Sequence, residues 1–523
     1  MLSNTHNEIN RKKSLQSILI GVYVLLIGIG LPLVVRDRYF DILIVKYFYY
    51  CFCTILMLFL LIVFFLISRT SKNTLGIKRF DIKNSINKFS KVDVLILLYW
   101  LVAFLSTLTS DYLYESFWGN EGRYTGLFLI TLYVLSYFCV SRFWIFKGWY
   151  IDSFIATGIV VCLFGITDYF KLDIFRFKEL MLESQRPIFT STIGNINTYT
   201  AYMGVVIGIA AVLFATEKNT LKMYYYYASM TIGFFAIIMG VSDNAYLSLA
   251  ILFGLLPIYL FSNSSGLKRY LIIIATFFTV SQCIDWINTF FSNNVLGIDS
   301  AFNLVISFKW LHYIVISLWL LILIFIFFES KRNVQLRYYG KRLIYIWITI
   351  ISIVMFGLAF ILYDCNVSGN IERYSSASNY LLFNDDWGTH RGYIWRNAME
   401  CFLNLPIWKK IVGYGPETFG ILLLRKTAGN PYNEIFDSAH NEYLHSLITV
   451  GILGLTFYVS ALIMFIKSCF NSKNNNSYIV AIAFGVMCYS AQAFVNLNLP
   501  IVTPIFWLLL SMGSAKSLNK VDV

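Results

Sequence analysis

Residues 47–68 read YFYYCFCTILMLFLLIVFFLIS, a continuous run that contains no charged side chain. As one helix, a run of this length crosses the hydrocarbon core of a bilayer, which is about 30 Å thick. Comparable apolar runs recur along the whole chain and predict fourteen spans. These lie near residues 15–35, 47–68, 94–109, 125–141, 150–167, 197–216, 224–241, 245–262, 270–284, 311–328, 343–363, 443–466, 478–496 and 500–515. We therefore expect an all-α, polytopic integral membrane protein with about 12–14 transmembrane helices and one long extracytoplasmic loop.

The overall composition favours the same class of protein. Of the 523 residues, 58% are hydrophobic, 18% are aromatic and only 13% are charged, whereas soluble proteins carry roughly 25% charged residues. No polar segment is long enough to build an independent core of ordinary domain size. The first apolar run has no convincing small-residue cleavage site and exceeds the usual apolar region of a signal peptide, so we expect it to stay in the chain.

The nine cysteines mostly fall in apolar runs, where they are expected to be small buried residues. Cys365 and Cys401 lie in the long polar stretch instead, which leaves a disulfide between them open. No spacing typical of metal ligands is visible, so the sequence predicts neither a metal site nor a cofactor.

The basic residues carry the net charge of +13 and predict the orientation. They cluster before the first span, after the second, before the eleventh and after the last, and alternation assigns all four clusters to one side. The positive-inside rule makes that side cytoplasmic, with the N-terminus on it. Basic clusters in short loops, without a basic soluble domain, speak against a nucleic-acid partner.

This orientation places four segments outside, at 110–124, 168–196, 285–310 and 364–442. The last is the only long polar stretch, and its tryptophans and glycine turns favour an ordered loop that carries function. The sequence thus predicts three parts: N-terminal transmembrane helices at 1–363, an extracytoplasmic catalytic loop at 364–442, and C-terminal transmembrane helices at 443–523.

Within the loop, residues 387–404 predict a helix that lies over the membrane. Its apolar face comprises Trp387, Tyr393, Ile394, Trp395, Ala398, Met399 and Phe402. His390, Arg391 and Arg396 form a cationic face, and Arg391 and Trp395 share one side because they are four residues apart. The alternative to a substrate site is an interfacial helix with aromatic anchors and snorkelling arginines.

Pro406 ends this helix, and Gly413-Tyr414-Gly415-Pro-Glu417 predicts a tight turn. Such a turn could bring backbone N–H groups close to a phosphate, although an ordinary loop turn has the same pattern.

Next comes Ser438-Ala-His440-Asn441-Glu442-Tyr443-Leu444-His445. A histidine at the outer mouth of a helix can act as a base near neutral pH, and Glu442 and His445 could orient or polarise His440. The alternative is a helix cap, made by Ser438 or Asn441, with no catalysis.

His440-Asn-Glu-Tyr-Leu444 followed by Gly451-Ile-Leu-Gly454 resembles the signature of the O-antigen ligase and polymerase superfamily. The resemblance extends to several elements in the family's order. These are Gly119 with Arg123-Tyr-Thr-Gly126, Arg186 with Thr192-Ile-Gly194-Asn195-Ile-Asn197, His390-Arg391-Gly-Tyr-Ile-Trp395 and Gly413-Tyr-Gly415. Together they cover roughly residues 118–455.

The resemblance implies a metal-independent glycosyltransferase that needs no cofactor and works at the outer face of the cytoplasmic membrane. Its partners would be membrane lipids, a polyprenyl-diphosphate-linked oligosaccharide donor and a glycan or glycolipid acceptor. It implies His440 as the base and Arg391 on the diphosphate leaving group, because arginine offers phosphate a charged, bidentate fork. The remaining expected substrate contacts are Arg186, Arg123, Asn195, Asn197, Tyr414, Asn441 and Tyr443.

One element departs from the family pattern. Many members carry an arginine near the outer end of a mid-chain span, where this chain reads Gly240-Val-Ser-Asp243-Asn-Ala-Tyr246. Asp243 cannot hold a phosphate without a cation. Either Arg186 or Arg123 supplies the missing charge, the substrate differs, or Asp243 is an ordinary polar residue of a short turn.

Two other functions remain open at this stage. A flippase for lipid-linked oligosaccharides, or another polysaccharide exporter, would also have many spans and a cationic cavity. Transporters usually show internal repeats and polar residues near the bilayer midplane, whereas here the notable polar residues lie at one face. A non-catalytic membrane scaffold or sensor is the third alternative.

Overall fold

The computed structural model describes residues 15–70, 89–120, 122–332, 340–471 and 476–515. Over these residues the chain is mostly helical. Its only sheet among them is a two-stranded antiparallel one, in which β1 (Phe189–Thr190) pairs with β2 (Gly194–Asn195). The prediction of an all-α, polytopic membrane protein is confirmed.

Ten helices of the described residues are long and apolar enough to cross a membrane. They are the first helix, Leu15–Leu33, and α3 (Ile42–Thr70), α5 (Lys91–Leu108), α8 (Trp149–Tyr169), α9 (Ile196–Thr216), α12 (Ser264–Phe290), α14 (Leu311–Arg332), α15 (Gly340–Asn366), α21 (Gly451–Phe470) and α22 (Ser477–Gln492). Four further helices form at the remaining predicted spans. These are α7 (Leu127–Phe143), α10 (Thr220–Met239), α11 (Ala245–Leu260) and α23 (Thr503–Gly513).

The predicted span at 443–466 is wrong in one respect, because it consists of two helices. The short helix α20 (Glu442–Thr449) ends at Val450, and α21 starts at Gly451. Gly451 has a φ of +70°, and a Cβ atom there would overlap the carbonyl oxygen of Ile411. The loop therefore packs against this break, and α20 lies outside the membrane-spanning helix α21.

Helix α9 forms the centre of the helix assembly, because its entire apolar window is buried. It packs against α8, α10, α11 and α22. The Gln492 side chain of α22 donates hydrogen bonds to the Thr200 carbonyl of α9 at 3.0 Å and to Ser248 Oγ of α11 at 2.8 Å. Buried polar contacts of this kind join helices where lipid offers no hydrophobic drive.

Helices α14 and α15 lie at the opposite extreme of burial. Only 11% of the apolar window of α14 is buried, and none of the window of α15. Since these side chains are nearly all apolar, both helices suit direct contact with lipid.

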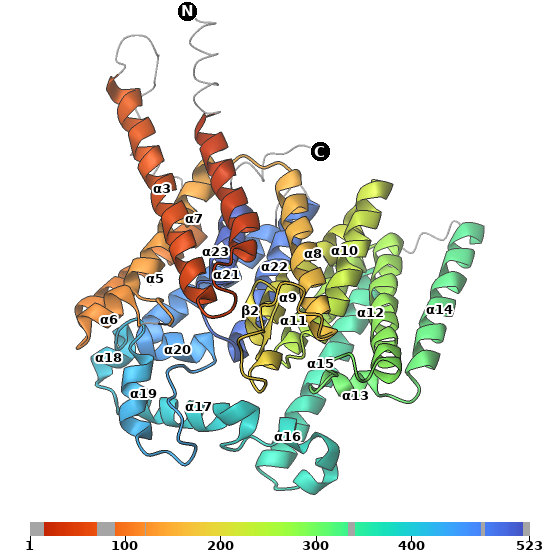
Figure 1. Cartoon of the computed structure of the whole chain (residues 1–523). Helices are drawn as coiled ribbons and strands as arrows, with labels where there is room; N and C mark the ends of the chain where they lie inside the picture. The colour runs from red at the N-terminus through yellow and green to blue at the C-terminus, as the bar shows by residue number, and fades with distance from the viewer. Residues whose placement is uncertain (1–14, 71–88, 121, 333–339, 472–475, 516–523) are drawn as a thin grey trace, which may run out of the picture.

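The short helices of the predicted outer segments gather at one end of the assembly, opposite the end at which the first helix begins (Figure 1). They are α6 (Leu113–Trp118), α13 (Phe302–Ile306), α16 (Ser378–Leu381), α17 (Trp387–Asn404), α18 (Ile407–Val412) and α19 (Phe419–Thr427). Ile394, Phe402, Phe419, Leu444 and Ile448 belong to a small buried cluster of their own, so the long loop is ordered. Cys365 and Cys401 are free thiols.

Candidate functional site

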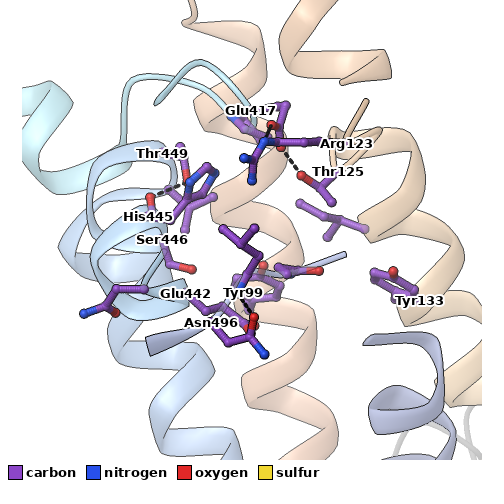
Figure 2. A pocket seen from close by; sticks show the side chains of 16 residues that line it. Tyr99, Arg123, Thr125, Tyr133, Glu417, Glu442, His445, Ser446, Thr449 and Asn496 are labelled. Carbon is purple, nitrogen blue, oxygen red and sulfur yellow. Dashed lines mark hydrogen bonds and ion pairs between the residues drawn. The ribbon is translucent and has the colours of Figure 1, made fainter. Parts of the chain in front are cut away.

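A pocket lies where the long loop meets the helix assembly (Figure 2). Its walls come from α5, the segment before α7, α7 itself, the turn at 416–417, α20 and residues 496–498. It encloses about 580 Å³ of empty space, part of which is open to solvent. Arg123 and Glu417 lie at one end of the pocket, and Glu442 and Asn496 lie toward the other.

The Arg123 end of the pocket is a network of opposite charges. Arg123 donates two hydrogen bonds to Asp437, at 3.1 and 2.6 Å, and lies 4.0 Å from Oε1 of Glu417. The Thr125 hydroxyl donates to Oε2 of Glu417. Oε1 of Glu417 is buried and has no hydrogen-bond partner. Burial raises the pKa of Glu417 to about 7, although Arg123 counteracts this effect.

Helix α20 forms one wall of the pocket. The Asn441 side chain caps it by accepting hydrogen bonds from the backbone N–H groups of Tyr443 and Leu444, both at 3.0 Å. This is the capping alternative considered above. His445 stacks on Phe419, and burial lowers its pKa to about 3. His445 is therefore an uncharged wall of the pocket at neutral pH.

Glu442 points to the helix assembly, not to His440. It accepts hydrogen bonds from the hydroxyls of Tyr458, at 2.9 Å, and Tyr489, at 3.4 Å. Burial raises its pKa to about 7. The suggestion that Glu442 orients His440 is therefore wrong, because both carboxylate oxygens are engaged elsewhere.

His440 lies beside the pocket with a strained backbone, its φ being +45°. Its N–H donates to Ser438 Oγ at 3.1 Å. Burial is the largest cause that lowers its pKa to about 4, followed by the positive charges of Arg391 and Arg123. His440 thus feels two arginines from different segments of the chain and is neutral at physiological pH. A non-glycine residue held at positive φ is the kind of strain that clusters at functional sites.

Arg391, on α17, acts on His440 through its charge. Gly388, Thr389 and His390 have positive φ, so the regular part of this helix begins only after them. One turn beyond Arg391, the Trp395 indole donates to the Ala439 carbonyl at 2.7 Å, which ties this face of α17 to the residue before His440. The predicted shared side of Arg391 and Trp395 therefore faces the candidate base.

The guanidinium group of Arg391 contacts the turn at 240–246, the segment that departs from the family pattern. Its Nη1 donates to Oδ1 of Asn244 at 3.4 Å. Burial lowers the pKa of Arg391, and the charge of Asp243 opposes that effect. Asp243 itself accepts the N–H of Ala301 at 2.8 Å. Arg391 thus occupies the space beside the turn at 240–246.

Three buried polar atoms around this turn have no hydrogen-bond partner. They are Nδ2 of Asn244, the hydroxyl of Tyr246 and Oγ of Ser300. A buried donor without a partner is costly in a folded protein. These three atoms, near Arg391, could therefore donate hydrogen bonds to a ligand that accepts them.

The cationic face expected on α17 is not formed. His390 stacks on Tyr432 and bonds Glu434 at 3.2 Å, while Arg396 holds Asp385 with two hydrogen bonds. Only Arg391 turns toward His440, because the left-handed residues before it redirect the start of the helix.

The turn at 413–417 does not offer its first N–H groups to a phosphate. The N–H of Tyr414 donates to the Ile448 carbonyl at 2.9 Å, and that of Gly415 donates to the Thr449 carbonyl at 3.0 Å. The Tyr414 ring lies 4.2 Å from Nζ of Lys409, away from the pocket. The turn instead joins the loop to the end of α20.

Of the predicted substrate contacts near α9 in sequence, Asn195 and Asn197 lie at the start of that helix, whereas Arg186 lies apart from the pocket. Asn195 caps α9, and Asn197 accepts from Ser242 at 2.6 Å and from the Asn496 amide, through its carbonyl, at 3.0 Å. Asn197 therefore links the turn at 240–246 to the pocket wall. Arg186 donates to the Met181 carbonyl at 3.3 Å.

Arg186 does not join the group around His440. Lys178 feels its charge, and in the described ranges no hydrogen bond or ion pair connects Arg186 with Arg391 or His440. Tyr443 donates to the Ser490 carbonyl at 2.6 Å and so anchors α20 to α22.

Sequence reasoning missed several residues of this site. Glu417 stood inside a motif already quoted, and His445 was considered only as a partner of His440; packing alone shows that both line a pocket. Asn496 and Asn498, two asparagines at the end of an apolar run, were a usable signal. Within the described part of the chain, no group of three or more His, Cys, Asp or Glu side chains could hold a metal ion.

Residues 295–459 match a family model described as O-antigen ligase. The matched region includes Arg391, Glu417, His440 and His445. A search of curated proteins found no match.

Proposed function

We propose that this chain is a surface polysaccharide polymerase or an O-antigen ligase-like glycosyltransferase, because residues 295–459 match a family model described as O-antigen ligase. It transfers a polyprenyl-diphosphate-linked oligosaccharide to a hydroxyl of a glycan or glycolipid acceptor, without a metal ion. The reaction takes place at the outer face of a bacterial cytoplasmic membrane, with the loop at 364–442 outside as the catalytic part and the N-terminus inside.

The observation that carries this proposal is the position of His440, a neutral histidine that feels Arg391 and Arg123. Arg391 is the cation for the donor diphosphate, because it lies beside the unpartnered amide of Asn244. Arg123 is already held by Asp437 and Glu417, so its part is to act on the site through its charge.

The transfer requires one bond to form and one to break. The acceptor hydroxyl oxygen attacks the anomeric carbon of the donor sugar, and the bond from that carbon to the diphosphate oxygen breaks. The electron pair leaves with the polyprenyl diphosphate, whose charge Arg391 stabilises in a poorly hydrated setting. The hydroxyl proton passes to His440.

The low pKa of His440 fits this sequence of events. Burial, together with the charges of Arg391 and Arg123, keeps the imidazole neutral, which is the form that can accept a proton. A bound diphosphate brings negative charge next to Arg391. This negative charge offsets part of the positive charge of Arg391 that lowers the pKa of His440. The base therefore becomes stronger when the donor is bound.

The test compares variants in proteoliposomes supplied with lipid-linked oligosaccharide. His440→Ala and Arg391→Ala should each lose transfer by roughly a hundredfold or more, in line with the loss of a general base or of a fixed charge. His390→Ala and Arg396→Ala are matched controls from the same loop, because both residues are bound away from His440. They should keep near wild-type transfer.

The outcomes separate an enzyme from a flippase. New glycosidic bonds formed by the purified chain support a transferase. Movement of the lipid-linked donor across the bilayer without any new bond would contradict the proposal, as would full transfer by His440→Ala.

A further inference from the structure

The pocket beside His440 contains several buried polar atoms that the protein leaves without a hydrogen-bond partner. They are Oε1 of Glu417, Oδ1 of Asn498 and the hydroxyl of Tyr133. Oδ1 of Asn498 can only accept a hydrogen bond, and the ionised carboxylate of Glu417 is also an acceptor only. Glu417 is 2% exposed, so water supplies little compensation. A ligand that completes these bonds must carry several hydrogen-bond donors.

The charges of the pocket disfavour a phosphate group there, in addition to the diphosphate assigned to Arg391. Glu417 and Glu442 both line it, and Arg123, its only cation among the described residues, is paired with Asp437 at 2.6 Å and lies 4.0 Å from Glu417. A phosphate would meet two acids and a guanidinium that is already engaged. A neutral ligand rich in hydroxyls meets no such cost.

The remaining walls suit the apolar faces of a sugar ring. The Tyr99 and Tyr133 rings, Ile130, Val450 and Leu497 line the pocket together with these polar atoms. Ligand sites commonly combine mostly apolar walls with a few placed polar groups. Sugars match this combination, because their rings present C–H surfaces between hydroxyls.

The pocket also has the right position relative to the candidate base. Asn441, the next residue after His440, lines the pocket, and Arg123 of the pocket acts on His440 by its charge. Arg391 acts on His440 as well and contacts the turn at 240–246. His440 is therefore next in sequence to a pocket residue and is influenced by the charge of Arg123 in the pocket and of Arg391 at the place assigned to the diphosphate.

We propose that this pocket is the acceptor subsite, which binds the terminal sugar of the acceptor glycan with Glu417 and Asn498 as hydrogen-bond acceptors. In this arrangement one sugar hydroxyl is directed at His440. The inference rests on the transferase function proposed above and adds the location and chemistry of the second substrate.

The test measures transfer from the donor with two probes: a soluble acceptor, which reports on the acceptor site, and a competitor, which reports on the diphosphate site. The donor is the lipid-linked oligosaccharide that accumulates in cells lacking this chain. The soluble acceptor is the same oligosaccharide, released from its lipid by mild acid. Farnesyl diphosphate serves as a competitor for the diphosphate site at Arg391.

Glu417→Gln should raise the KM for the soluble acceptor roughly tenfold or more, since a strong charged acceptor is replaced. The inhibition constant of farnesyl diphosphate should change by less than about twofold, because that site is separate. Glu400→Gln is the matched control. Glu400 pairs with Lys426 at 3.0 Å, both half-exposed and outside the pocket, so both constants should stay at the wild-type value.

An unchanged acceptor KM in folded Glu417→Gln, or an equal loss of farnesyl diphosphate inhibition, overturns the acceptor subsite and leaves the transferase function standing. No transfer by the wild-type chain overturns the function instead. In that case, tryptophan fluorescence measures the dissociation constant of the released oligosaccharide. A dissociation constant for Glu417→Gln equal to that of the wild type overturns the subsite. If Glu417→Gln does not fold, Asn498→Leu provides the same comparison, with the same expected rise.

Discussion

Two acids and one base of the site differ in how they respond to pH. His440 has a pKa of about 4 and stays neutral across the physiological range, whereas Glu417 and Glu442 have pKa values raised to about 7. The carboxyl groups, not the histidine, therefore change charge near neutral pH. This reverses the usual expectation that a histidine is the sensor.

The first prediction concerns Glu417. As the pH rises through about 7, its carboxyl ionises and becomes a stronger hydrogen-bond acceptor, so the acceptor KM should fall. Because Glu442 also lines the pocket and its pKa is also raised to about 7, Glu417→Gln should give a flatter profile than the wild type between pH 6 and 8, not a level one. The measurement is the KM for the soluble acceptor at several pH values, and a pH dependence as steep in Glu417→Gln as in the wild type would contradict the assignment.

The second prediction concerns stability and Glu442. Because its pKa is higher in the folded chain than in the unfolded one, its protonation stabilises the fold below about pH 4.5. That contribution is lost as the pH rises to about 7. The change amounts to roughly 3 kcal/mol as an upper order of magnitude. Glu442→Gln should therefore show a smaller fall of the melting temperature between pH 5 and 8 in detergent, measured by scanning fluorimetry. An identical fall would contradict the buried acid.

At the scale of helices, the contact between α18 and the break before α21 holds the pocket wall in place. Gly413 has a φ of +106°, and a Cβ atom there would overlap the Thr449 carbonyl, which accepts the N–H of Gly415 and the Ser106 hydroxyl. Gly413 and Gly451 thus allow the loop and the end of α20 to approach backbone to backbone.

The third prediction tests that contact. Gly413→Ala should lower the melting temperature and the transfer activity together, because it combines strain at positive φ with a steric overlap, at a cost of about 2 kcal/mol or more. Gly429→Ala is the control, since Gly429 also has a positive φ, of +72°, but has open space around it. A loss of equal size in both variants would show that backbone strain alone is responsible.

The helices could be predicted from the sequence, whereas the contacts of the site residues could not. Each apolar run formed a helix because length and hydropathy suffice in a bilayer. The break at Gly451 could not be predicted, because both sides of it are apolar and its cause lies at Ile411. The same holds for Arg391: its sequence position predicts a helix face, but only the fold shows Asn244 opposite it. His440 was identifiable from its motif, whereas Glu417 was not identifiable as a pocket residue.

At the scale of the whole molecule, the helices α17, α18, α19 and α20 of the site region lie toward one end of the helix assembly (Figure 1). The fourth prediction is that this end is extracytoplasmic. Ala428→Cys, exposed in the long loop, should react with an impermeant thiol reagent in intact cells. Lys218→Cys, exposed between α9 and α10, should be protected, and the wild-type chain measures the reaction of the native cysteines. The reverse pattern would invert the orientation.

Because α15 packs sparsely, the end of the long loop that follows α15 is attached less firmly than the end that precedes α20. On one side, the loop follows a helix whose apolar window has no buried side chain. On the other side, it is anchored through Trp395, Tyr414 and Tyr443 to α20, α22 and their neighbours. The two attachments are therefore unequal, and the peptide bonds next to Gly369, which has open space around it, form an exposed joint. A single proteolytic cut at this joint should leave two fragments that purify together and still transfer sugar, as gel analysis and the transfer assay would show.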